Sequence, residues 1–334
     1  MQRRLAISHV ATLASALAAP WLAGCAGEPS AAPPSNAALR DERLLTLTRT
    51  LPGGFLAPPT PVIGVPARPG TGMFVKWVAP TALALRGPDL LVLDAAVGRL
   101  WRADAMLNTV TGIAGAPTGD RIAVALGADL SAWVLDPPAR QVLRFARDGR
   151  LMQTFRSDAI AAGPSALALA DGGLTLLVAD SASASWSEQR AGSAPVLRVA
   201  PTHGGGQRIS GVDGLAIGRA DRNDVWVLDR LAGAVHRVTR DGRVVESRGR
   251  GVLKQPQSIA VDRFDRVWVL DAIEQALIGL STSEPPLRLT NTQLRVQQIG
   301  GMAIDEDQLA ISDRLVGQVL LYRLGRPGTV GALP

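Results

Sequence analysis

Six aspartates recur along the chain at nearly equal intervals. They stand at positions 94, 136, 180, 229, 271 and 313, which are 42, 44, 49, 42 and 42 residues apart. Carboxylate oxygens are hard ligands, and about six to eight of them in one place would bind calcium. The regular interval instead places each aspartate at an equivalent site of a repeated unit, where a strand ends. An aspartate there accepts backbone N–H bonds and begins a turn, so we expect these six residues to be structural.

Histidine and cysteine are too few to predict a zinc site. The chain has three histidines and one cysteine. His236 occupies a strand position that Trp101 and Leu143 hold elsewhere in the repeat, so we expect it in the core. His203 lies in a predicted hairpin loop, Pro201–Gly206. Zinc needs about three or four convergent ligands, which these residues cannot supply. The sequence also contains neither a P-loop nor a Gly-x-Ser-x-Gly elbow, so we expect no cofactor.

A serine-rich stretch in the third repeat predicts a binding surface. In three units an arginine follows the repeat aspartate by eight residues, as Arg144 follows Asp136, but Arg198 follows Asp180 by eighteen. The difference, 18 − 8 = 10 residues, predicts an exposed loop between the second and third strands of this unit. Exposed Trp and Arg side chains are typical interface anchors, although a Trp in such a loop can also fold back onto the rim. The residues that we expect to contact a partner are Trp186, Glu188 and Arg190.

Residues 1–24 have the composition of an export signal. Two arginines precede a mildly apolar stretch that is too short and too interrupted to span a membrane. Leu22-Ala23-Gly24-Cys25 resembles the bacterial lipobox, and Cys25 is the only cysteine. The resemblance implies that a peptidase cuts before Cys25 and that this residue then carries lipid. The alternative is an ordinary signal peptide that leaves a buried thiol.

Residues 25–40 predict a tether between this lipid and a folded domain. They are rich in Pro, Ala and Ser, a composition that favours extended chain over a packed core. Acyl chains on Cys25 would anchor the protein without a transmembrane segment. Ala26 is not the aspartate that retains lipoproteins in the inner membrane, so the resemblance favours the periplasmic side of the outer membrane in a Gram-negative cell envelope.

Residues 41–334 repeat one pattern of short apolar runs separated by Gly and Asp turns. Trp-Val-Leu-Asp occurs at three of the six aspartates, and another apolar run precedes each of them. Such runs are typical of antiparallel strands joined by hairpins. A four-stranded unit of this length cannot cover both of its faces, but a ring of such units can. The sequence therefore predicts an all-β, six-bladed β-propeller of four-stranded antiparallel blades, in which Leu44–Thr48 pairs with Gln318–Leu324 to close the ring.

The repeat resembles that of NHL-repeat propellers. Pro256–Asp262 and Val267–Asp271 match the two strand motifs of that family, and an apolar residue stands six positions after the repeat aspartate in five units. The resemblance covers residues 74–324 and implies a six-bladed propeller. The Asn and Arg that the family often places between its second and third strands are mostly absent here, apart from Arg99. A related propeller of quinoprotein type with more blades is the alternative.

Charge and motif content favour binding over catalysis. The net charge is +6, but acidic and basic residues are interspersed and Lys76 and Lys254 are the only lysines, so no nucleic-acid site is expected. We expect a membrane-anchored, extracytoplasmic, non-catalytic module that binds a protein or an envelope polymer. The alternative is a propeller hydrolase or lactonase with a divalent ion on its axis, which leaves the question of enzymatic activity open.

Overall fold

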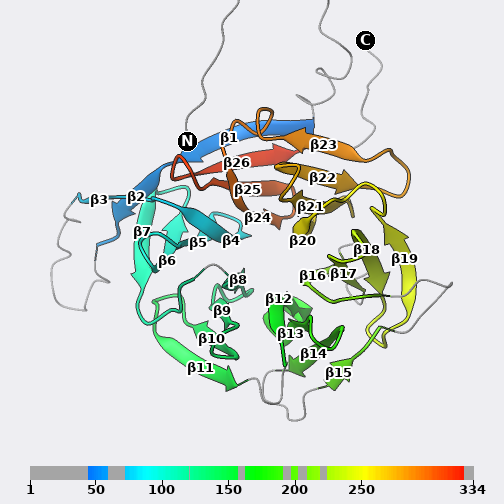
Figure 1. The fold of residues 1–334 in the computed structure, drawn as a ribbon. Coiled ribbons are helices and arrows are strands. Elements are labelled where there is room, and N and C mark those ends of the chain that lie inside the picture. Colours follow the sequence, from blue (N-terminus) through cyan, green and yellow to red (C-terminus); the bar gives the residue numbers. More distant parts are fainter. Residues whose placement is uncertain are drawn as a thin grey trace, which may run out of the picture.

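The chain forms six β-sheets arranged around a central axis (Figure 1). The computed structural model describes residues 44–58, 72–119, 121–156, 162–190, 197–201, 209–218 and 224–326. No helix within these ranges is long and apolar enough to cross a membrane. The predicted all-β, six-bladed propeller is confirmed.

Each blade is an antiparallel meander whose first strand lies nearest the axis (Figure 1). Blade one contains β4 (Pro80–Arg86), β5 (Asp89–Asp94), β6 (Arg99–Asp104) and β7 (Thr109–Ile113), and blade two contains β8 (Ala123–Leu126), β9 (Ala132–Asp136), β10 (Gln141–Phe145) and β11 (Leu151–Arg156). Blade three contains β12 (Pro164–Ala170), the 3₁₀ turn η2 (Asp171–Gly173), β13 (Thr175–Asp180), β14 (Ser185–Arg190) and β15 (Leu197–Val199).

The remaining three blades repeat this order. Blade four contains β16 (Gly214–Ile217), β17 (Val225–Asp229), β18 (Ala234–Val238) and β19 (Val244–Arg248). Blade five contains β20 (Pro256–Val261), β21 (Val267–Asp271), β22 (Ala276–Leu280) and β23 (Leu287–Thr290). Blade six contains β24 (Ile299–Asp305), β25 (Gln308–Asp313), β26 (Gln318–Leu324) and β1 (Leu45–Leu51).

The hydrophobic core is divided into layers between neighbouring blades. Six clusters of buried side chains occur, and each joins one blade to the next. The second strands are apolar at successive positions because each of their faces is covered by an adjacent blade. Trp101, Trp133, Trp226 and Trp268 are buried in these layers. The guanidinium groups of Arg144 and Arg248 lie 4.9 and 4.6 Å from the ring centres of Trp133 and Trp226.

The N-terminal strand closes the ring, as the sequence predicts. β1 pairs antiparallel with β26 along blade six, from Leu45 opposite Leu324 to Leu51 opposite Val319. Leu51 is buried between blades six and one. The ring is therefore held together by main-chain hydrogen bonds between the two ends of the propeller sequence.

Blade one is wider than predicted. β2 (Gly53–Leu56) pairs parallel with β7, and β3 (Phe74–Lys76) pairs antiparallel with β2, so the sheet has six strands. The repeat does not predict these two strands because they precede the first unit and are only four and three residues long.

Blades six and one approach each other closely through glycines. A Cβ added at Gly301 would collide with the carbonyl oxygen of Thr81, and one at Gly317 would collide with that of Trp77. Gly317 also has a positive φ of 75°, which L side chains rarely adopt. Glycine at these positions lets the last blade pack against the first where the ring closes.

Candidate functional site

The six repeat aspartates bind loops at one end of the propeller, which we call the aspartate end. The Asp271 carboxylate is fully buried and accepts the backbone N–H groups of Lys254, Gln255 and Glu274 at 2.6, 3.0 and 3.2 Å. Thus it ties the connection entering its blade to the loop between the second and third strands. Comparable bonds are made by Asp94, Asp180, Asp229 and Asp313. The predicted structural role is confirmed.

Asp136 and Asp180 show how much this role depends on burial. Burial alone would raise the pKa of Asp180, but the hydrogen bonds it accepts, first from the backbone of Ala162, outweigh burial and hold that pKa below its usual range. Asp136 is half-buried and accepts bonds only from the N–H of Ala139 and the amide of Gln141 within the described residues.

The exposed charges of the aspartate end are all positive within the part of the chain that the structure describes. The acidic residues there are the six repeat aspartates, Asp213 and Glu274, and none of them is exposed. The ion pairs among described residues involve none of the exposed basic residues of this end. These basic residues are Arg99, Arg121, Arg140, Arg156, Arg230, Arg250, Lys254, Arg295 and Arg314.

The same end exposes large apolar side chains at one repeated position. Leu231, Ile273 and Leu315 each follow a repeat aspartate by two residues, and their exposed fractions are 83, 67 and 64%. They lie on three successive blades, four to six. Four exposed valines extend this apolar surface along the same end: Val78, Val97, Val252 and Val316. Clustered exposed apolar groups with a polar surround are typical of interaction surfaces.

A cavity of about 790 Å³ runs along the axis. It is lined by the first strands of the six blades, which carry Ala or Gly at alternating positions such as Ala82, Ala84, Ala166 and Ala168. Small side chains fit there because the blades converge on the axis. Each first strand is also the edge of its sheet, so its unpaired backbone N–H and C=O groups face this space.

The two mouths of the cavity differ in charge. Arg121, Arg230, Asp213 and Gln257 line the mouth at the aspartate end. The other mouth is lined by Arg86, Asp171, Asp305 and Glu306. It lies at the end where the first strand of a blade turns into the second and the third into the fourth, which we call the hairpin end. Among the residues with described positions, no three His, Cys, Asp or Glu side chains are grouped so that they could hold a metal ion. An anionic group therefore meets favourable charge at the aspartate end.

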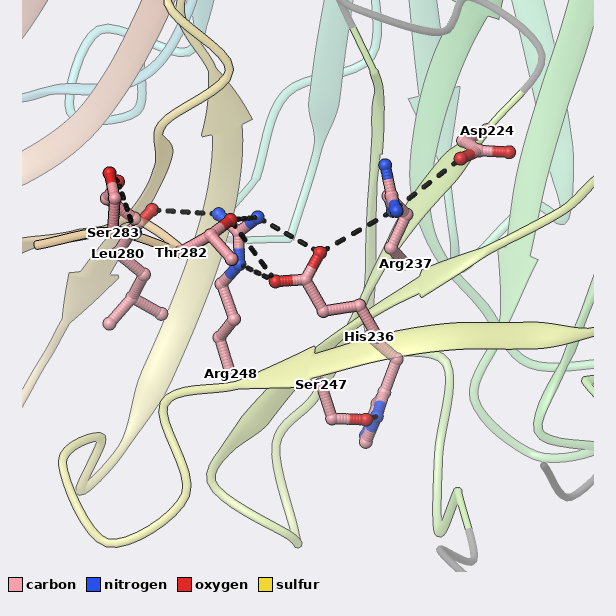
Figure 2. A network of polar contacts seen from close by, with 10 residues as sticks. Asp224, His236, Arg237, Ser247, Arg248, Leu280, Thr282 and Ser283 are labelled. Carbon is pink, nitrogen blue, oxygen red and sulfur yellow. Dashed lines mark hydrogen bonds and ion pairs between the residues drawn. The ribbon is translucent and has the colours of Figure 1, made fainter. Parts of the chain in front are cut away.

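Networks of ion pairs and hydrogen bonds away from the aspartate end connect neighbouring blades. Figure 2 shows one such network, in which Arg237 lies 3.6 Å from both Asp224 and Glu246. Glu246 also pairs with Arg248 at 2.6 Å, and Arg248 donates to Thr282 of the next blade. Burial would raise the pKa of Glu246, but the two arginines outweigh it and hold that pKa below its usual range. We interpret this network as a connection between blades four and five.

His236 is a core residue, as predicted. It is fully buried on β18, and its Nδ1 lies 2.7 Å from the Ser247 hydroxyl (Figure 2). Desolvation lowers the pKa of His236, although the carboxylate of Asp229 acts in the opposite direction. His203 and Cys25 lie outside the described residues, as does the predicted tether 25–40.

The expected loop in the third repeat is wrong. Ser185–Arg190 form β14, the third strand of the blade, and Trp186 is 0% exposed within the layer between blades three and four. Trp186 stands six residues after Asp180, the position that apolar residues fill in the other repeats, and this signal was available in the sequence. Glu188, and not Arg198, stands eight residues after Asp180, so the expected ten extra residues do not occur there; β14 and β15 are six residues apart, as are β22 and β23.

The three residues predicted to bind a partner therefore lie in different surroundings. Trp186 is buried and donates its indole N–H to Glu188 at 3.0 Å. Glu188 accepts two hydrogen bonds of 2.6 Å from Arg240 of blade four, which makes it a link between blades. Arg190 is exposed at the end of β14. The structure does not bring them together as one exposed surface.

Comparison with known proteins identifies the fold alone. No family model matches the chain, and no curated protein resembles it in sequence. A gluconolactonase from Xanthomonas campestris has a similar structure, with a TM-score of 0.56, 15% identity, and coverage of 83% of this chain and 98% of that one. Virginiamycin B lyase from Staphylococcus aureus gives 0.55 and 10%, covering 74% and 95%. The Cps50 (Swd1) propeller domain from Myceliophthora thermophila gives 0.54 and 9%, covering 75% and 98%.

Proposed function

We propose that this chain is an exported, lipid-anchored binding module that resembles NHL-repeat propellers and whose aspartate end binds a protein with an acidic, partly apolar surface. The carrying observation is that the exposed charges of this end are all basic among the described residues and share this end with the exposed Leu231, Ile273 and Leu315. Arginine pairs bidentately with carboxylates, and desolvated aliphatic side chains supply affinity. An anionic envelope polymer would use the cations but not the apolar side chains.

The proposed anchor is lipid on Cys25. The support is the lipobox-like Leu22–Cys25 together with a Pro/Ala/Ser-rich segment that separates it from β1. Lipidation would place the propeller in the cell envelope, on the periplasmic side of the outer membrane in a Gram-negative cell. The aspartate end would then meet its partner in that compartment without any transmembrane segment in this protein.

Charge reversal at the aspartate end should weaken partner binding. In detergent extracts of the cell envelope, the chain carrying Arg230→Glu and Arg314→Glu is expected to retain about tenfold less partner than the wild type, because two charges change sign beside an acidic surface and the net charge falls by four units. The measurement is quantitative capture on immobilised protein at low and moderate salt.

The matched control carries Arg150→Glu and Arg243→Glu, which reverse the same number of exposed arginines at the hairpin end. It should capture as much partner as the wild type. Equal losses in both variants would contradict the proposed binding face. Material that stays bound after complete proteolysis of the extract would identify a polymer instead of a protein. Calcium-dependent hydrolysis of lactones by the purified protein would favour the hydrolase alternative.

A further inference from the structure

A second exposed apolar surface lies on the outer part of blade one, where the structure adds two strands to the repeat. Met106 and Leu107 are 73 and 72% exposed in the turn between β6 and β7. Three further exposed side chains come from β2 and from the beginning of β3. We call the whole surface the blade-one patch, and it consists of Phe55, Met73, Phe74, Met106 and Leu107.

The patch is assembled by pairing of β2 with both of its neighbours. Phe55 and Phe74 are directly opposite each other on β2 and β3, and their ring centres are 5.2 Å apart in an edge-to-face arrangement. The N–H of Phe55 donates to the carbonyl of Asn108 at 2.9 Å, which joins this strand pair to the Met106–Leu107 turn. The aromatic and aliphatic parts therefore belong to one continuous structure.

The turn is held in its exposed form by specific bonds. One oxygen of Asp104 accepts the N–H groups of Met106 and Leu107, both at 2.9 Å. The guanidinium of Arg49 on β1 donates to the carbonyl of Ala105 and, at 3.3 Å, to that of Met106. Because these bonds fix the backbone of the turn, Met106 and Leu107 are already held in exposed positions. Binding through them therefore costs little further conformational entropy.

The chain from the proposed lipid anchor enters the propeller on blade six, at the layer that this blade forms with blade five, where Leu45 packs. β1 begins at Leu45, opposite Leu324, whose N–H donates to the carbonyl of Asp307 in a hairpin turn of blade six. The β6–β7 turn lies at the same hairpin end, on the neighbouring blade. Twenty residues separate Cys25 from Leu45, and a chain of that length spans at most about 70 Å. A lipid on Cys25 thus stays within reach of the patch.

We infer that the blade-one patch inserts into the interfacial layer of the bilayer that holds the Cys25 lipid. This inference rests on the proposed lipid anchoring. Exposed Phe, Met and Leu side chains are suited to the boundary between headgroups and acyl chains, and the exposed Arg49 and Lys76 beside them can meet lipid phosphates. A tethered lipid makes this contact intramolecular, so that even weak insertion is populated. The aspartate end then points away from the bilayer, towards its partner.

The aspartate end is the other surface that combines apolar and basic side chains. It competes for the same role, but β1 leads to Cys25 from the opposite end of the propeller. An experiment that compares the two surfaces on one membrane therefore tests the inference directly.

The test uses the mature lipidated protein in vesicles of phosphatidylethanolamine and phosphatidylglycerol that contain spin-labelled lipid. An environment-sensitive fluorophore is attached through Met106→Cys in one protein and through Ile273→Cys in another, since acylation and thioether formation leave Cys25 unreactive. We expect the probe at position 106 to shift to the blue and to lose most of its fluorescence to the spin label. The probe at position 273 should behave as it does in water.

Each outcome separates anchoring from insertion. Protein that does not float with the vesicles would overturn the lipid anchor, and the inference with it. Protein that floats with both probes in water would overturn the inference alone, and quenching at position 273 in place of position 106 would show that the aspartate end faces the bilayer. Adding Phe55→Ser and Leu107→Ser to the Met106→Cys protein should reduce quenching while flotation and the urea unfolding midpoint stay unchanged.

Discussion

A chain that begins at Pro52 is expected to lose the closed propeller, whereas a chain that begins at Asp41 is expected to keep it. The shorter chain lacks β1, which pairs with β26 at six register positions. At about 1 kcal/mol for each backbone hydrogen bond, together with the burial of Leu51, the loss is about 5 kcal/mol or more. That is comparable with the whole stability of many domains.

Urea unfolding and size-exclusion chromatography of the two chains test this prediction. The chain from Pro52 should unfold at much lower urea or associate through the exposed edge of β26. A peptide of residues 41–51 should restore its stability by adding the missing strand. Unfolding midpoints that agree between the two chains would contradict closure of the ring by β1.

Replacing Asp271 by Ala should cost about 3–5 kcal/mol of folding free energy, because three backbone N–H groups lose a buried, charged acceptor. Asp136→Ala is the matched control at the equivalent position of blade two. That carboxylate is half-buried and accepts bonds from its own turn alone within the described residues, so its loss should cost about 1 kcal/mol.

The measurement is equilibrium urea unfolding of both variants, with a check that the slope of the transition is unchanged. Equal losses for the two substitutions would show that the loops of the aspartate end are not held by the repeat aspartates. The Asp271→Ala protein should also capture less partner, since this carboxylate fixes the backbone on either side of Ile273.

The repeat made most of the propeller predictable from the sequence. Each of the regularly spaced aspartates marks the end of the second strand of one blade. The earlier apolar run that precedes this strand is the strand nearest the axis. The closing strand was predictable because leucines alternate with polar residues along it, which is typical of a strand that packs on a sheet through one face. β2 and β3 were not, since strands of four and three residues outside the repeat carry no periodic signal.

The third blade shows how a correct fold can be given a wrong local register. Matching Asp180 to Arg198 by the spacing of arginines treated a polar residue, whose place in the repeat varies, as the marker of a strand. The apolar position six residues after each aspartate is the better marker because burial between blades constrains it, and it places Trp186 in the core. Glu188 then takes the position that Arg144 holds in blade two, and it pairs with Arg240.

The proposed binding face could not be predicted before the fold was in place. Leu231, Ile273 and Leu315 are more than forty residues apart in sequence, and each by itself is an ordinary turn residue. Only the ring brings all the loops that follow a repeat aspartate to one end. That the exposed basic residues assigned to that end form no ion pair with the described residues is likewise a property of the assembled blades.

The most direct test of the account is photo-cross-linking in intact cells, with a photoreactive residue in place of Ile273 at the aspartate end or of Asp148 at the hairpin end. Both positions lie in exposed turns. We predict a discrete protein adduct from position 273 that disappears when Arg230→Glu and Arg314→Glu are added, and no such adduct from position 148. The same protein adduct from position 148 and none from position 273 would contradict the assignment of the aspartate end as the binding face.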